Sequence, residues 1–358
     1  MNVRYKNKEK MKLRHRKIWL IIVILALLLT LFLLFFVKNN TPKNNISSAE
    51  LREAQKQLNI RILRYEQDLF SLDVNNLQKE IERLSKIYPP LLIEPNIWND
   101  TVQLEKLKAF LQDTVIIALY HAAEKIIKTD VILKELETAF GYYKVFYPND
   151  SIPKIITQLL GLDFSIPSIY IYDDILFVNI DMYLGANNPY YTAVGMPVYI
   201  TERCEPIFLP IDIFKKAMVY KHLARVPHIT LLDAMITEGK KLYFTEMMFP
   251  TLHERYIIGY SEEKYTWANH YVGNSWSYLI EKNELFGKGE TLIRTYIEEA
   301  PFIKPFGNES PGRMGAFLGW KLIQSYMTNN PEVTLPELLQ ETDYQKILNL
   351  SKFKPQPK

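Results

Sequence analysis

Apolar residues recur at helical spacing through most of the chain. Leu77, Ile81 and Leu84 lie three or four residues apart, which predicts a helix that ends before Pro89-Pro90. The same spacing predicts helices over residues 102–126, 130–142, 211–226 and 230–248. Thr230 stands three residues before Asp233, a pattern typical of a helix start.

Two short β-prone runs predict a hairpin. Residues 169–172 and 175–180 are rich in Ile, Tyr, Val and Phe, and only Asp173-Asp174 separates them. Ile60 and Ile62 alternate with polar residues and predict a further short strand. Helix therefore exceeds strand, and the sequence predicts a mostly helical α+β domain with a small sheet.

Residues 18–37 form an apolar run without a charged side chain. At about 1.5 Å per residue, such a run matches a hydrocarbon core of roughly 30 Å and predicts a transmembrane helix. The preceding residues 1–17 contain eight Lys or Arg and one acid, Glu9, which predicts a cytoplasmic N-terminus. The alternative, a cleaved signal peptide, would have a shorter apolar region and small residues at its cleavage site.

The predicted organisation follows from this run. A basic cytoplasmic tail (1–17) precedes the transmembrane helix (18–37), a polar linker (38–49) and one extracytoplasmic domain (50–358). The expected location is the inner membrane, with a single pass and a periplasmic domain.

Charge and cysteine content exclude several classes of protein. The net charge of +3 comes from the basic tail, which is +7, so the rest of the chain carries −4. A mildly acidic domain is not expected to bind nucleic acid. Cys204 is the single cysteine, which excludes an internal disulfide and a cysteine-based zinc cluster.

A zinc-peptidase motif requires two His four residues apart, with a Glu after the first. No two of the six histidines have this spacing. Counting back from His222, Met218 stands at the first His position and Val219 at the Glu position. Neither side chain can supply an imidazole or a carboxylate, so we expect no metal, no other cofactor and no catalytic residue.

Glu238 lies within an apolar stripe of the helix predicted over 230–248. An ionised carboxylate is costly to bury, so Glu238 is expected to have a cationic partner, for which Arg313 is one candidate. A structural carboxylate is the preferred interpretation, and a ligand or catalytic acid is the alternative. Gly239 beside it favours close packing of another helix.

The segment 310–320 contains a second glycine pattern. Ser310 and Pro311 are typical of a helix start, where backbone amides can bind an anion. Gly312, Gly315 and Gly319 lie three and four residues apart, which favours close approach of another helix over phosphate binding.

Several stretches together resemble the gliding-motility-associated lipoprotein family (GldB) of Bacteroidetes, and their order covers about residues 55–355. These stretches are residues 60–70, Ile180-Asp181-Met182-Tyr183-Leu184-Gly185, residues 255–260, the 310–320 segment with Gln324-Ser325-Tyr326-Met327, and the closing Ser351-Lys352-Phe353-Lys354-Pro355. The resemblance implies service to the gliding or type 9 secretion machinery, through contacts with other envelope proteins. Typical members carry a lipidated cysteine, whereas this chain has an apolar span.

The family is in turn similar to predicted zinc-dependent proteases, which implies a zincin-like scaffold. In those proteases the position of Glu238 carries the third metal ligand, and His222 falls at another ligand position. Because Met218 and Val219 depart from the active pattern, the resemblance implies a pseudoenzyme that has lost its metal. Glu238, His222 and Arg313 are the candidate structural or vestigial site residues, with His222 a second candidate partner of Glu238.

Two other functions stay open from the sequence. One is a membrane-anchored zinc peptidase or other envelope hydrolase. The other is a peptidoglycan- or glycan-binding module, for which the 23 tyrosines and the expected extracytoplasmic location are the only arguments.

Overall fold

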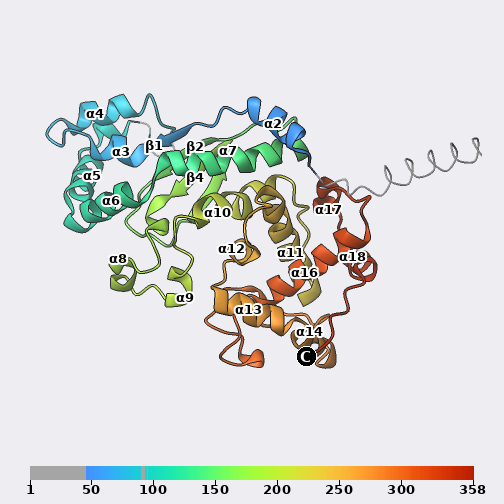
Figure 1. Cartoon of the computed structure of the whole chain (residues 1–358). Coiled ribbons are helices and arrows are strands. Elements are labelled where there is room, and N and C mark those ends of the chain that lie inside the picture. The colour runs from blue at the N-terminus through green and yellow to red at the C-terminus, as the bar shows by residue number, and fades with distance from the viewer. Residues whose placement is uncertain (1–45, 90–92, 95) are drawn as a thin grey trace, which may run out of the picture. The chain divides into compact units, whose positions relative to one another are not determined.

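A computed structural model describes residues 46–358 except 90–92 and 95 (Figure 1). The predicted basic tail, the transmembrane helix at 18–37 and most of the linker lie outside these residues. Within the described part, no helix has the length and apolarity needed to cross a bilayer. The chain divides into two units: Ile46–Asn329 with Leu335–Lys358, and Met1–Asn45 with Asn330–Thr334. In the second unit, the described residues form a short turn and loop.

Helices make up most of the first unit. Its first half contains α2 (Ser48–Lys56), α3 (Tyr65–Phe70), α4 (Leu77–Leu84), α5 (Thr101–Gln112), α6 (Thr114–Ile126), α7 (Thr129–Phe146), α8 (Pro189–Ala193), α9 (Val198–Thr201) and α10 (Phe208–Lys216). Its second half contains α11 (Leu231–Met248), α12 (Glu254–Ile258), α13 (Glu262–His270), α14 (Val272–Glu281), α15 (Glu290–Ile297), α16 (Met314–Asn329), α17 (Leu335–Gln340) and α18 (Tyr344–Ser351). Short 3-10 helices are η1 (Ile97–Asn99), η2 (Ile180–Tyr183), η3 (Met218–Lys221) and η4 (Lys304–Phe306).

The described strands form one four-stranded sheet in the order β1-β2-β4-β3. Strands β1 (Ile62–Arg64) and β4 (Ile175–Asn179) both pair in parallel with β2 (Lys154–Gln158). Strand β3 (Ile169–Tyr172) pairs antiparallel with β4, which confirms the predicted hairpin. Asp173 and Asp174 both have positive φ, as a two-residue hairpin turn requires.

The predicted mostly helical α+β class is confirmed, but three helix predictions need correction. The helix expected over 102–126 is two helices, because the side chain of Asp113 accepts hydrogen bonds from the amides of Val115 and Ile116 and so caps α6. The helix expected over 211–226 ends at Lys216 and is followed by the tighter turn η3, in which Met218 and Val219 are fully buried.

The third correction concerns the predicted start at Ser310. Helix α16 begins only at Met314, because Arg313 has a φ of 59°, in the left-handed region that an α-helix excludes. The Ser310 hydroxyl instead donates to the carbonyl of Gly307 at 2.7 Å and accepts from the amide of Ile303 at 3.0 Å. Ser310 therefore fixes the loop before α16 rather than capping the helix.

Helices α11 and α16 form the centre of the larger core. They pack extensively against each other, and most of their side chains are buried. The backbones meet at Gly239 and Gly319, where a Cβ on either glycine would overlap the backbone of the opposite helix. This confirms the close helix approach that the glycine spacing predicts.

A second apolar cluster lies at the other side of the sheet. It joins α3, α4 and α5 through Leu69, Ile81, Leu84 and Leu111, with Phe177 of β4 packed against them. Figure 1 shows these helices grouped beside β1, while α11, α16 and α18 lie together elsewhere in the unit. The candidate site residues belong to the α10, α11 and α16 side.

Candidate functional site

Glu238 projects from α11 into a set of charged side chains. One of its carboxylate oxygens pairs with Lys241, which follows three residues later on the same helix. The other lies 3.4 Å from Nη2 of Arg313. Only 16% of the Glu238 side chain is exposed, so both cations act on a nearly desolvated carboxylate.

The electrostatics of Glu238 favour its charged form. Burial raises the pKa of a carboxyl group, but Lys241 and then Arg313 outweigh that effect, and the pKa of Glu238 lies below its ordinary value. Lys241 is itself held in place, since its ammonium donates to the hydroxyl of Tyr220 at 2.8 Å. Glu238 is thus an ionised carboxylate with cations on both oxygens.

Arg313 is held by the loop that precedes α16. Its Nη1 donates to the carbonyl of Ile258 at 3.1 Å, and the neighbouring Gly312 carbonyl accepts from Tyr260 at 2.6 Å. The side chain is 9% exposed, and the backbone of Arg313 has a positive φ of 59°, in the left-handed region.

Glu299 connects Arg313 to a second arginine. It lies in the loop after α15, where one carboxylate oxygen is 3.5 Å from Nη1 of Arg313 and also pairs with Nη1 of Arg203. Arg203 in turn lies 3.9 Å from Asp212 on α10. A chain of alternating charges therefore runs from α11 to α10.

Asp212 is the most enclosed member of this chain. Its carboxylate is 3.2 Å from the ammonium of Lys215 and 2.7 Å from that of Lys216, and it accepts a hydrogen bond from Tyr183 at 3.1 Å. Burial alone would raise the pKa of Asp212, but Lys216, Lys215 and Arg203 hold it well below its usual range. Burial lowers the pKa of Lys215 to about 7.

These side chains line an open cleft, which we call the charged cleft. It is a pocket of ≈ 520 Å³ whose charged lining consists of Arg203, Lys215, Lys216, Lys241 and Arg313 with Glu238, Glu298 and Glu299. A smaller recess of ≈ 190 Å³ adjoins it and shares Arg203, Lys216 and Glu299. Such a surface can bind charged groups through ion pairs and hydrogen bonds.

The structure places His222 in a different cluster. Its Nε2 lies 2.9 Å from a carboxylate oxygen of Asp150 and 2.8 Å from the Tyr143 hydroxyl, and its ring stacks on Tyr147 at 3.6 Å. Burial lowers the pKa of His222, against the opposing effect of Asp150. Of the two partners expected for Glu238, the structure brings Arg313 to it and joins His222 to Asp150.

The residues at the expected metal position do not fit a zinc ion. Met218 and Val219 are buried and offer no ligand for it, and both Glu238 oxygens face cations. Within the residues that the structure describes, no three His, Cys, Asp or Glu side chains converge in a way that could hold a metal. We therefore assign no metal-dependent step to this site.

Sequence reasoning missed several members of the charged cleft. Some of these ion pairs could have been predicted, because residues three and four apart share a helix face. Lys215 and Lys216 follow Asp212 at this spacing, and Lys241 follows Glu238. Arg203 and Glu299 lie outside the regular helices, where no periodicity marks them.

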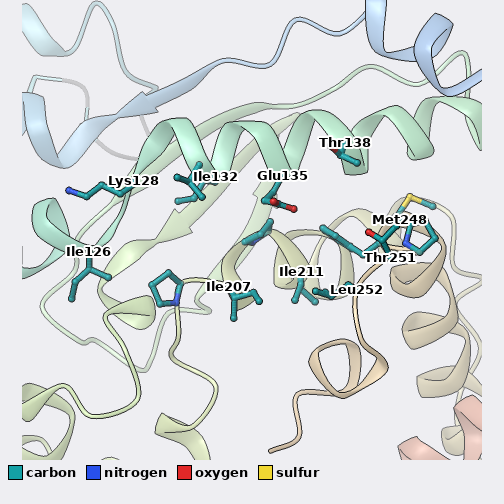
Figure 2. Close-up of a pocket in the computed structure, with 15 residues that line it drawn as sticks. Ile126, Lys128, Ile132, Glu135, Thr138, Ile207, Ile211, Met248, Thr251 and Leu252 are labelled. Atoms are coloured by element: carbon teal, nitrogen blue, oxygen red, sulfur yellow. The ribbon is translucent and has the colours of Figure 1, made fainter. Parts of the chain in front are cut away.

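A second pocket, of ≈ 540 Å³, lies between α7, α10 and the segment that follows α11 (Figure 2). Ile132, Ile207, Ile211 and Leu252 project toward it, and Glu135 is among its few polar residues. This lining can exclude water from an apolar group but does not converge polar atoms on one point.

Fold and site together define a helical α+β protein with a charged cleft whose lining side chains are ion-paired with one another. The sequence profile of the family described as gliding motility protein GldB matches residues 45–355. The chain belongs to this family, and it is a gliding-motility-related protein of the cell envelope. Comparison with curated proteins and with solved structures finds no match.

Proposed function

We propose that the chain is a non-enzymatic component of the gliding machinery that acts through contacts with other envelope proteins. Its scaffold is related to zinc peptidases and has lost the metal site. The observation that carries this proposal is the double ion pair of Glu238 with Lys241 and Arg313. A carboxylate committed to two internal cations serves the fold and is a poor metal ligand.

The sequence adds a second argument. The positions that an active zinc peptidase fills with His and Glu hold Met218 and Val219, and both side chains are fully buried. Restoring a metal site would require new side chains as well as release of Glu238 from its partners. The apolar run at residues 18–37 supports a single-pass anchor in the inner membrane, with the domain in the periplasm.

Zinc content of the full-length protein, purified in detergent and dialysed, tests the proposal. We expect the zinc bound per chain to be far below stoichiometric. Stoichiometric zinc that is lost in Glu238→Gln would instead support the alternative function, a membrane-anchored zinc peptidase.

Glu246→Gln is the matched control for that measurement. Glu246 lies two turns further along α11 and accepts a hydrogen bond from Trp320 at 2.7 Å, away from Arg313. Zinc that disappears equally in both variants would indicate general damage to the helix rather than loss of a ligand.

A further inference from the structure

The carboxylate of Glu299 occupies a position between two arginines. It pairs with Arg203 and Arg313, whose side chains are only 15% and 9% exposed, whereas the Glu299 side chain is 34% exposed. The two guanidinium groups are therefore more deeply buried than the carboxylate that pairs with them. Glu299 lies in a loop, which can move more readily than a helix.

Neither arginine depends on Glu299 for its only counter-charge. Arg313 also faces Glu238, and Arg203 also faces Asp212. The Nε of Arg203 is buried beside Gly259 and has no hydrogen-bond partner among the described residues, so the contacts of Arg203 with Glu299 and Asp212 run through its terminal nitrogens. Displacement of Glu299 would thus leave two partly neutralised guanidinium groups that can accept another anion.

The chemistry of the site favours a carboxylate. A planar guanidinium presents paired N–H donors that match the two oxygens of a carboxylate, and Glu299 is a carboxylate already bound there. The adjoining pocket of ≈ 520 Å³ is large enough for more than a small ion, and Lys216, Lys241 and Tyr220 line it.

We propose that Arg203 and Arg313 bind a carboxylate of an acidic peptide segment from a partner protein, and that Glu299 is an internal competitor for the same site. This rests on the proposed function, action through protein contacts, and specifies the group that is recognised. The carboxylate is either an acidic side chain or a C-terminus, and both have the same chemistry. Binding requires that Glu299 leave the arginines, so the free chain holds the site closed.

Three short peptides test the proposal by calorimetry on the full-length protein. Acetyl-Ala-Ala-Glu-amide carries a side-chain carboxylate, acetyl-Ala-Ala-Ala carries a C-terminal carboxylate, and acetyl-Ala-Ala-Gln-amide carries neither. The variant Glu299→Gln lacks the internal competitor. At least one carboxylate peptide should therefore bind this variant about tenfold more tightly than it binds the wild type. A tenfold gain corresponds to Glu299 occupying the site in about nine-tenths of the wild-type molecules. The neutral peptide should not bind to either protein.

Glu298→Gln is the matched control. Glu298 is the neighbouring residue and lies 2.9 Å from Arg294 on α15, so its removal deletes the same charge without freeing the two cleft arginines. Glu298 also lines the charged cleft, so its loss can raise the affinity for an anion slightly, but we expect a far smaller gain than in Glu299→Gln because Glu298 pairs with Arg294. Glu299→Ala, which also removes the competitor, provides the same readout if Glu299→Gln does not fold.

Three results would overturn the proposal: no carboxylate peptide binds either Glu299 variant, Glu298→Gln gains as much affinity as the Glu299 variants, or the neutral peptide binds as well as the charged ones. The two carboxylate peptides show which source of the carboxylate is preferred. None of these results alters the zinc content, which tests the proposed function separately.

Discussion

The crossing of α11 and α16 offers a sharp test of the packing, through the substitution Gly319→Ala. A Cβ on Gly319 would overlap the carbonyl of Met235, and a Cβ on Gly239 would lie 2.9 Å from the amide nitrogen of Trp320 besides overlapping Gly319 itself. These neighbours are backbone atoms of helices, so they cannot rotate away as a side chain can. The added methyl group must push the two helices apart.

The loss of stability depends on the packing that is disturbed when the two helices move apart. Alanine improves helix propensity by up to about 1 kcal/mol over glycine, which opposes the effect. Overpacking costs about 1–3 kcal/mol when side chains can adjust, and more when they cannot. Because Phe317, Leu318 and Trp320 beside the crossing are fully buried, we expect Gly319→Ala to lower the free energy of unfolding by about 3 kcal/mol.

Urea unfolding followed by far-UV circular dichroism measures this loss. Gly141→Ala is the control, since Gly141 also lies inside a helix but its Cβ would meet a flexible side chain, with Cγ of Gln55 at 2.7 Å. We expect that variant to unfold within about 1 kcal/mol of the wild type. Equal stability of Gly319→Ala and the wild type would refute the close crossing.

Two further predictions concern pH and topology. Lys240 is 1% exposed, and burial lowers its pKa to about 8 from 10.5. Below about pH 8 the buried ammonium is charged and destabilises the folded state fully. As the pH rises toward 10.5 the folded state loses this charge before the unfolded state does, and the penalty disappears. The stability of the wild type relative to Lys240→Met should therefore rise by about 3 kcal/mol over that range in urea titrations, and a flat difference would contradict the buried charge. An alkaline phosphatase reporter fused after residue 50 should be active, because that enzyme folds in an oxidising compartment; an inactive reporter at full expression would reject a periplasmic domain.

The sequence predicts the hairpin and the start of α11, because these depend on residues close together in the chain. The hairpin of β3 and β4 follows from two β-prone runs around Asp173-Asp174, and Thr230 caps the start of α11 through the predicted capping box with Asp233. Strand β2 (Lys154–Gln158) could not be predicted in the same way, because its pairing with β1 joins residues far apart in sequence. Such partners are chosen by tertiary packing.

In the candidate site, too, the sequence predicts the contacts that depend on one helix face but not those made between loops. An acid on an apolar helix face predicts a cationic partner for Glu238, and Arg313 fills that role. Glu299 and Arg203 come together through loops whose course no periodicity encodes. His222 is near Glu238 in sequence, yet stacking on Tyr147 and pairing with Asp150 place it in another cluster.

We propose that Glu238 stabilises the fold as an ion-paired carboxylate and does not bind metal. Unfolding of Glu238→Ala and Glu238→Gln, each with and without added zinc, tests it most directly. Removing the carboxylate leaves Arg313 and Lys241 without one of their partners, which costs about 3 kcal/mol for an enclosed pair, and Glu238→Gln should cost less because the amide oxygen still accepts a hydrogen bond. We expect both variants to lose stability, Glu238→Ala more than Glu238→Gln, and added zinc to leave the stability of the wild type and both variants unchanged. Zinc that stabilises only the wild type, together with unaltered stability of Glu238→Ala in its absence, would contradict it.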